Sequence, residues 1–138
     1  MRAINIRQKT DPAAEGDLLA LVAHKLGLGR LAGFVIEGLT PYGAMTSEVR
    51  EAILRRAVYT GLPVVRVGRG NAQGFADPHP DFIAGSNLTS TKARMLLMAC
   101  LMKFGSLPPA RDPGHPSPSE LRAVRDVVAA YQDVFDTH

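Results

Sequence analysis

Residues 81–102 read Asp81-Phe-Ile-Ala-Gly-Ser-Asn-Leu-Thr-Ser-Thr-Lys-Ala-Arg94 and then Met95-Leu-Leu-Met-Ala-Cys-Leu-Met102. A short apolar strand, Phe82–Ala84, ends in a turn of small and polar residues. An almost wholly apolar helix follows, from about Ser90 to Phe104. A strand that leads into a buried helix is typical of a sheet covered by helices. This stretch therefore predicts an α/β fold.

The same alternation of strand and helix extends upstream. Strands are predicted at Ala3–Ile6, Leu31–Ile36 and Pro63–Val67, and helices from Asp11-Pro12 to about Leu26 and from Thr46 or Ser47 to Gly61. The strands are apolar with little polar alternation, which is the pattern of parallel strands buried on both faces. We therefore predict a three-layer α/β/α sandwich with a parallel sheet of about four strands.

The C-terminal part of the chain predicts a loop and one more helix. Residues 106–116 are rich in Pro and Gly, and Ser117-Pro-Ser-Glu120 is a capping box with Pro at the first helical position. The apolar stripe of this helix packs either on its own domain or on a second subunit. The predicted organisation is an α/β domain over 1–105, a loop over 106–116 and a C-terminal helix over 117–138.

Composition excludes several classes of protein. The 138 residues are 46% hydrophobic and 21% charged, which indicates one globular domain. The net charge of +3 is spread along the chain without a basic cluster or interleaved aromatics, so we expect no nucleic-acid partner. No apolar run is long enough for a membrane span and no signal peptide is visible, so we expect no membrane contact and a cytoplasmic location.

The loops after the strands could form a ligand site. In an open parallel sheet, ligands bind beyond the carboxyl ends of the strands. Four residues of these loops, Thr40, Tyr42, Arg66 and Asn87, could converge on a small polar or anionic ligand. The alternative is that they are ordinary loop residues that cap helices. The sequence leaves both readings open.

Glu37 ends an apolar strand, where a buried carboxylate needs a partner. Arg66, at the matching end of the next strand, is the expected one. We favour a structural ion pair over a general base. Glu37 joins Thr40, Tyr42, Arg66 and Asn87 as a candidate ligand-binding residue.

Other reactive residues give weaker signals. The four histidines show no metal-ligand spacing, so we expect no metal, and no cofactor motif is present. Asp77-Pro-His79-Pro-Asp81 looks like an acid–His cluster, but its alternate prolines more simply make a stiff loop. Cys100 lies within an apolar helix and is expected to be a small buried residue.

The chain resembles the carboxy-terminal domain of bacterial L-asparaginases along most of Ala3–Lys103. The matching segments are Ala3–Ile6 with Asp11-Pro12, Phe34-Val-Ile-Glu-Gly38, Leu62-Pro-Val-Val-Arg66 and Phe82–Arg94. The last two resemble the family's "P-V-V-R" strand and its "F-I-A-x-x-N-L-x-x-x-K-A-R" segment. Their order and spacing also fit. The resemblance implies the three-layer fold of that domain and subunit contacts in an oligomer.

The chain departs from the family at its catalytic parts. The amino-terminal half that carries the nucleophilic Thr has no counterpart here. The loop that resembles the family's "G-N-G-N" reads Gly38-Leu-Thr-Pro-Tyr-Gly43 and has no Asn. The acidic residue lent from the loop before the last strand has only Asp77 and Asp81 as candidates. We therefore assign no catalytic residue.

Three functions follow from these observations. The first is a non-catalytic module that acts as a homodimer or as a partner-binding subunit. The second is one half of a split L-asparaginase, completed by a separate chain with the amino-terminal domain. The third is a small binder of an amino acid or carboxylate, using the loops around Thr40 and Arg66.

Overall fold

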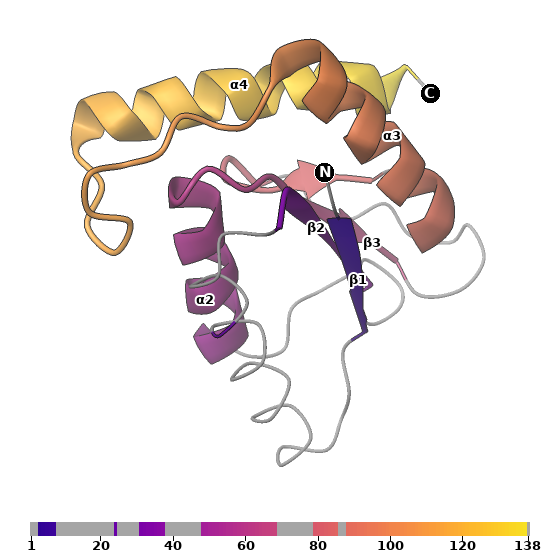
Figure 1. The fold of residues 1–138 in the computed structure, drawn as a ribbon, viewed down its shortest axis with the longest axis horizontal. Coiled ribbons are helices and arrows are strands. Elements are labelled where there is room, and N and C mark those ends of the chain that lie inside the picture. Colours follow the sequence, from indigo (N-terminus) through magenta and orange to yellow (C-terminus); the bar gives the residue numbers. More distant parts are fainter. Residues whose placement is uncertain are drawn as a thin grey trace.

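The computed structural model describes residues 3–7, 24, 31–37, 48–68, 79–85 and 88–137 (Figure 1). In chain order the elements are β1 (Ala3–Arg7), β2 (Gly33–Glu37), α2 (Glu48–Tyr59), β3 (Val64–Val67), β4 (Ile83–Ala84), α3 (Ser90–Phe104) and α4 (Pro118–Asp136). Apart from His24, which is helical, the helix expected between Asp11 and Leu26 lies outside the described residues.

The strands form one sheet in the order β1-β2-β3-β4, and every neighbouring pair is parallel. Val35 lies opposite Val65, and Val65 lies opposite Ile83. Apart from Glu37 and Arg66, the side chains of β2 and β3 are apolar, and Phe34–Ile36 are fully buried. This explains the lack of polar alternation. The predicted α/β class and parallel sheet are confirmed.

Each described helix has a different place against the sheet. α3 packs against β1, β2 and β3, α4 packs against β4 and against α3, and α2 packs against β3. In Figure 1, α3 and α4 lie together along the upper side of the molecule. The apolar stripe of α4 is buried within its own chain, and its buried members are Val124, Val128, Tyr131 and Phe135. The described core therefore extends along the sequence from Phe34 to Phe135.

The two C-terminal helices begin and end at residues with specific caps. Thr89 accepts a hydrogen bond from the Lys92 amide (3.3 Å) at the start of α3, and Gly105 ends the helix at φ 78°. The predicted capping box of α4 is formed, because Glu120 accepts from the Ser117 amide (3.0 Å) and donates its own amide to the Ser117 hydroxyl (3.3 Å).

The edge strand β4 is held by backbone contacts on one side and by α4 on the other. The Gly85 amide donates to the Arg66 carbonyl (2.7 Å), and a Cβ at residue 85 would lie 2.4 Å from Val67 Cγ1. On the free side, Gln132 of α4 accepts from the Ala84 amide (2.8 Å) and donates to the Ala84 carbonyl (3.1 Å). A side-chain amide thus occupies hydrogen-bonding groups that another strand would otherwise pair with.

Candidate functional site

The structure describes only part of the ligand site expected beyond the strand ends. Thr40, Tyr42 and Asn87 lie outside the described residues. Glu37 ends β2, and Arg66 lies within β3. The convergence of the five expected ligand-binding residues therefore stays a prediction.

The sheet register bears on the expected Glu37–Arg66 pair. Glu37 lies opposite Val67, whereas Arg66 lies opposite Ile36. Residues at successive levels of a sheet point to opposite faces, so the backbone directs these two side chains away from each other. The Arg66 guanidinium carbon instead lies 5.6 Å from the centroid of the Phe82 ring. The two residues lie near matching strand ends, as expected, but one level apart in the sheet.

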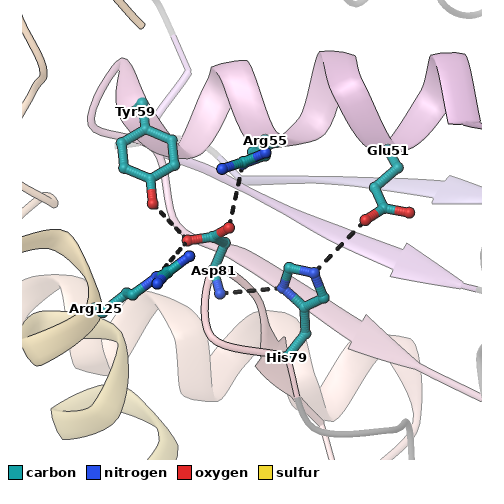
Figure 2. Close-up of polar contacts among 6 residues, drawn as sticks. All are labelled: Glu51, Arg55, Tyr59, His79, Asp81 and Arg125. Atoms are coloured by element: carbon teal, nitrogen blue, oxygen red, sulfur yellow. Dashed lines mark hydrogen bonds and ion pairs between the residues drawn. The ribbon is translucent and has the colours of Figure 1, made fainter. Parts of the chain in front are cut away.

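A buried polar cluster forms around Asp81, at the entrance to β4 (Figure 2). Asp81 is 2% exposed and receives three side-chain donors. The Tyr59 hydroxyl donates to Oδ1 at 2.5 Å, and Arg125 Nε donates to the same oxygen at 3.2 Å. Arg55 Nε lies 3.3 Å from Oδ2. The cost of burying this carboxylate is thus offset by charged and neutral donors.

The donors come from two helices that are distant in sequence. Glu51, Arg55 and Tyr59 follow one another at four-residue intervals in α2, so they lie in one row on the helix surface. Figure 2 shows this row facing the segment that holds His79 and Asp81. Arg125 reaches the same carboxylate from α4. The cluster therefore joins α2, β4 and α4 at one point.

His79 lies at the rim of this cluster. Its Nδ1 accepts a hydrogen bond from the Asp81 amide (3.1 Å), and its Nε2 lies 3.6 Å from Glu51 Oε1. An accepting Nδ1 carries no proton, so the geometry fits the neutral tautomer with hydrogen on Nε2. Burial lowers the pKa of His79 below 6.5, and the charges of Arg66 and Arg55 act in the same direction.

The chemistry available in the cluster is limited by these contacts. Burial and the bond to Asp81 raise the pKa of Tyr59 to about 12, so its hydroxyl stays protonated. The bond to Asp81 raises the pKa of Arg125. A general base must reach a substrate proton, and Asp81 is buried with a donor from the chain on each of its oxygens. The cluster therefore links α2, the start of β4 and α4, and it contains no activated nucleophile.

Cys100 is the other reactive group in the described core. It is buried in α3, as the sequence predicts, and burial raises the pKa of its thiol. A thiol is nucleophilic as the thiolate, which this environment disfavours.

The outward side of α3 presents apolar side chains to solvent. Met95 is 69% exposed and Met102 is 79% exposed. Met98 is half-buried and Ala99 is exposed. These four residues, which we call the methionine face, follow the i, i+3, i+4, i+7 spacing of one helix side.

The methionine face corrects the expectation of a buried helix. The residues of α3 that point to the core are Ala93, Leu97, Cys100 and Leu101. A single helix packed on a sheet buries one side only, and the apolar sequence of α3 exceeds what that side needs. The excess apolar surface is the signal that sequence reasoning missed.

Comparisons with known proteins add no relative. No family model matches the chain, and neither curated proteins nor solved structures give a match. In the described parts of the chain, no helix has the length and apolar character needed to cross a membrane. Among those same residues, no three His, Cys, Asp or Glu side chains gather closely enough to hold a metal ion.

Proposed function

We propose that this chain is a non-catalytic α/β module that associates with a second copy of itself through the methionine face. The observation that carries the proposal is the exposure of Met95 and Met102, at 69% and 79%. Large apolar side chains gathered on one exposed helix face mark interaction sites. Methionine suits such a surface because its flexible, polarisable side chain adapts to different partners.

The same proposal includes the finer features of the fold. We place the chain in a three-layer α/β/α sandwich similar to the carboxy-terminal domain of bacterial L-asparaginases. The parallel four-stranded sheet and the apolar segment that runs from β4 into α3 support this placement. A cytoplasmic location fits a chain whose single cysteine is a buried thiol.

The lack of catalysis rests on the described polar groups. Amide hydrolysis by an asparaginase route needs an activated hydroxyl, a base and an oxyanion site. The Tyr59 hydroxyl donates a hydrogen bond to Asp81, and both Asp81 oxygens face donors from within the chain. The alternative of a split L-asparaginase would obtain the missing groups from a second, different chain.

The test is the solution mass of the purified chain, measured by sedimentation over a series of concentrations. We expect a species of twice the 14.8 kDa of one chain. The double variant Met95→Lys/Met102→Lys should be monomeric, because it removes apolar area from the contact and would bury two ammonium groups there. Ala52→Lys, at an exposed position of α2, is the matched control and should leave the dimer intact.

Two results would contradict the proposal. One is a monomeric wild-type chain at every concentration. The other is ammonia release from asparagine or glutamine by the chain alone, because it would reveal a nucleophile and base within the chain. Turnover that appears only after addition of a chain with the Thr-bearing half would instead establish the split enzyme.

A further inference from the structure

Helix α3 carries only positive charge. Its 15 residues contain Lys92, Arg94 and Lys103 and no acidic residue. Lys92 lies in the first turn, where the helix dipole favours negative side chains. The three basic residues flank the methionine face, with Arg94 on one side and the two lysines on the other. The exposed apolar stripe therefore has a basic rim.

Helix α4 is mixed in charge, with Arg122 and Arg125 in its first half and only aspartates among the charged residues that follow. Three aspartates, Asp126, Asp133 and Asp136, are exposed between the middle of the helix and its end, and its last turn has no basic residue. The helix dipole favours positive side chains at this end. The aspartates and Ala129 follow the spacing i, i+3, i+7, i+10 and share one outward side. We call these four residues the acidic face.

The charges of the two faces are not neutralised within the described part of the chain. The ion pairs there join Asp81 to Arg55 and Arg125, Glu51 to His79, and Asp112 to His115. Asp136 accepts a hydrogen bond from the neutral Gln132 (2.8 Å). Each face thus keeps the charge that would complement the other.

Pairing of α3 with α3 of a second copy is disfavoured by these charges. A two-fold axis between two antiparallel α3 helices centred on the methionine face would bring Lys92 beside Lys103 of the other copy. Both lysines lie on the same flank of the stripe, so like charges would meet on that flank twice. Like-charge contacts oppose association.

We propose that the methionine face of one copy packs on the acidic face of α4 in the second copy. This inference rests on the proposed self-association and names its contact. Ala129 leaves room for methionine side chains between the aspartates, and the lysines of α3 lie at the rim to meet those carboxylates. In a two-fold dimer the contact forms twice, because each copy presents both faces.

The two helices are placed to serve such a dimer. They pack against each other within one chain, where the Phe104 and Tyr131 ring centroids lie 5.5 Å apart. Figure 1 shows them together along the same side of the molecule. A second copy on this side can therefore meet α3 and α4 at once.

The test uses two charge-reversed variants and their mixture. Lys92→Glu/Lys103→Glu makes α3 acidic, and Asp126→Lys/Asp133→Lys makes the acidic face basic. Each variant alone would set like charges against each other, so we expect its dimer Kd to rise by roughly tenfold or more. The mixture would set opposite charges in both contacts, so we expect a heterodimer close to wild type in affinity.

Sedimentation with a fluorescent label on one variant distinguishes the outcomes. Arg56→Glu, which reverses an exposed charge on α2, is the control and should leave the dimer unchanged. Recovery of dimer only in the mixture supports the α3–α4 contact. Variants that dimerise as wild type does, or that fail to recover on mixing although circular dichroism shows them folded, overturn it. The proposed self-association would still stand if Met95→Lys/Met102→Lys abolished the wild-type dimer.

Discussion

The Asp81 cluster and the methionine face meet solvent in opposite ways. Asp81 is a charged group held at 2% exposure, and donors from α2 and α4 surround it within one chain. Met102 is an apolar side chain left 79% exposed on α3. The first region is satisfied by contacts within the chain, whereas the second leaves apolar surface exposed among the described residues. This contrast is the basis for our proposal that the chain functions through α3 rather than through the polar cluster.

The strongest test of this contrast compares two apolar residues of α3. Leu97→Ala should lower the free energy of unfolding by about 2–5 kcal/mol, because Leu97 is fully buried and its loss leaves a cavity. Met102→Ala should change it by less than about 0.5 kcal/mol. Urea denaturation, at protein concentrations low enough for the chain to be monomeric, measures the free energy of unfolding of both variants. Equal losses from the two variants would contradict the one-sided packing of α3.

Removing the carboxylate of the polar cluster should also lower the stability of the fold. Asp81→Ala leaves the buried Tyr59 hydroxyl without its acceptor and separates α2 from α4. Arg55 and Arg125 are 49% and 41% exposed, so water can solvate them and the expected loss is reduced. We expect Asp81→Ala to lower the free energy of unfolding by about 2–4 kcal/mol, measured by urea denaturation.

Asp81→Asn is the matched variant for this test. It keeps an acceptor for Tyr59 but removes the charge, so its loss of stability should be smaller. A change of less than about 1 kcal/mol in Asp81→Ala would show that the cluster does not hold the helices together.

Adding a single methyl group at Gly85 should lower the free energy of unfolding by less than Leu97→Ala or Asp81→Ala does. In Gly85→Ala the new Cβ would lie 2.4 Å from Val67 Cγ1 and 3.0 Å from the Arg66 carbonyl oxygen. Overpacking of this kind costs about 1–3 kcal/mol. Gly114→Ala is the control, because its new Cβ meets only Asp112 Oδ1, at 3.5 Å. Equal thermal midpoints for the two variants would contradict the close approach of β3 and β4.

The smallest expected effect is a dependence of stability on pH that arises from His79. The folded chain lowers the pKa of His79 below 6.5, mainly through burial, so the unfolded chain binds more protons there. Stability should therefore fall as pH drops below about 6.5, until the folded pKa is passed. Protonation of Nδ1 also removes the acceptor for the Asp81 amide.

The matched variant for this dependence is His79→Asn, which offers an acceptor oxygen but no titrating group. Thermal unfolding between pH 7 and pH 5 should show a shallower loss in the variant than in the wild type, because these values bracket the usual histidine range of about 6.5. Identical slopes would show that His79 does not carry the effect.

The predictability of each region from sequence follows from the distance between interacting residues. The apolar runs of β2 and β3 and the capping box at Ser117 are local patterns, and the structure contains all of them. Asp81 meets Tyr59 across 22 residues and Arg125 across 44, and no local pattern links them. The apolar sequence of α3 predicted a helix but not how many of its sides are covered.

Prediction of the candidate ligand site from sequence was limited in a similar way. Arg66 was expected beside Glu37 because both lie near strand ends, but pairing between strands is set by a register that sequence alone does not supply. Thr40, Tyr42 and Asn87 lie outside the described residues, so their convergence stays a prediction.

The most direct test of the central claim is sedimentation of the wild-type chain beside Met95→Lys/Met102→Lys. We predict twice the 14.8 kDa chain mass for the wild type and the single-chain mass for the variant, with the same circular dichroism. A wild-type chain that sediments as a monomer, or a dimer that survives the two substitutions, would contradict the account.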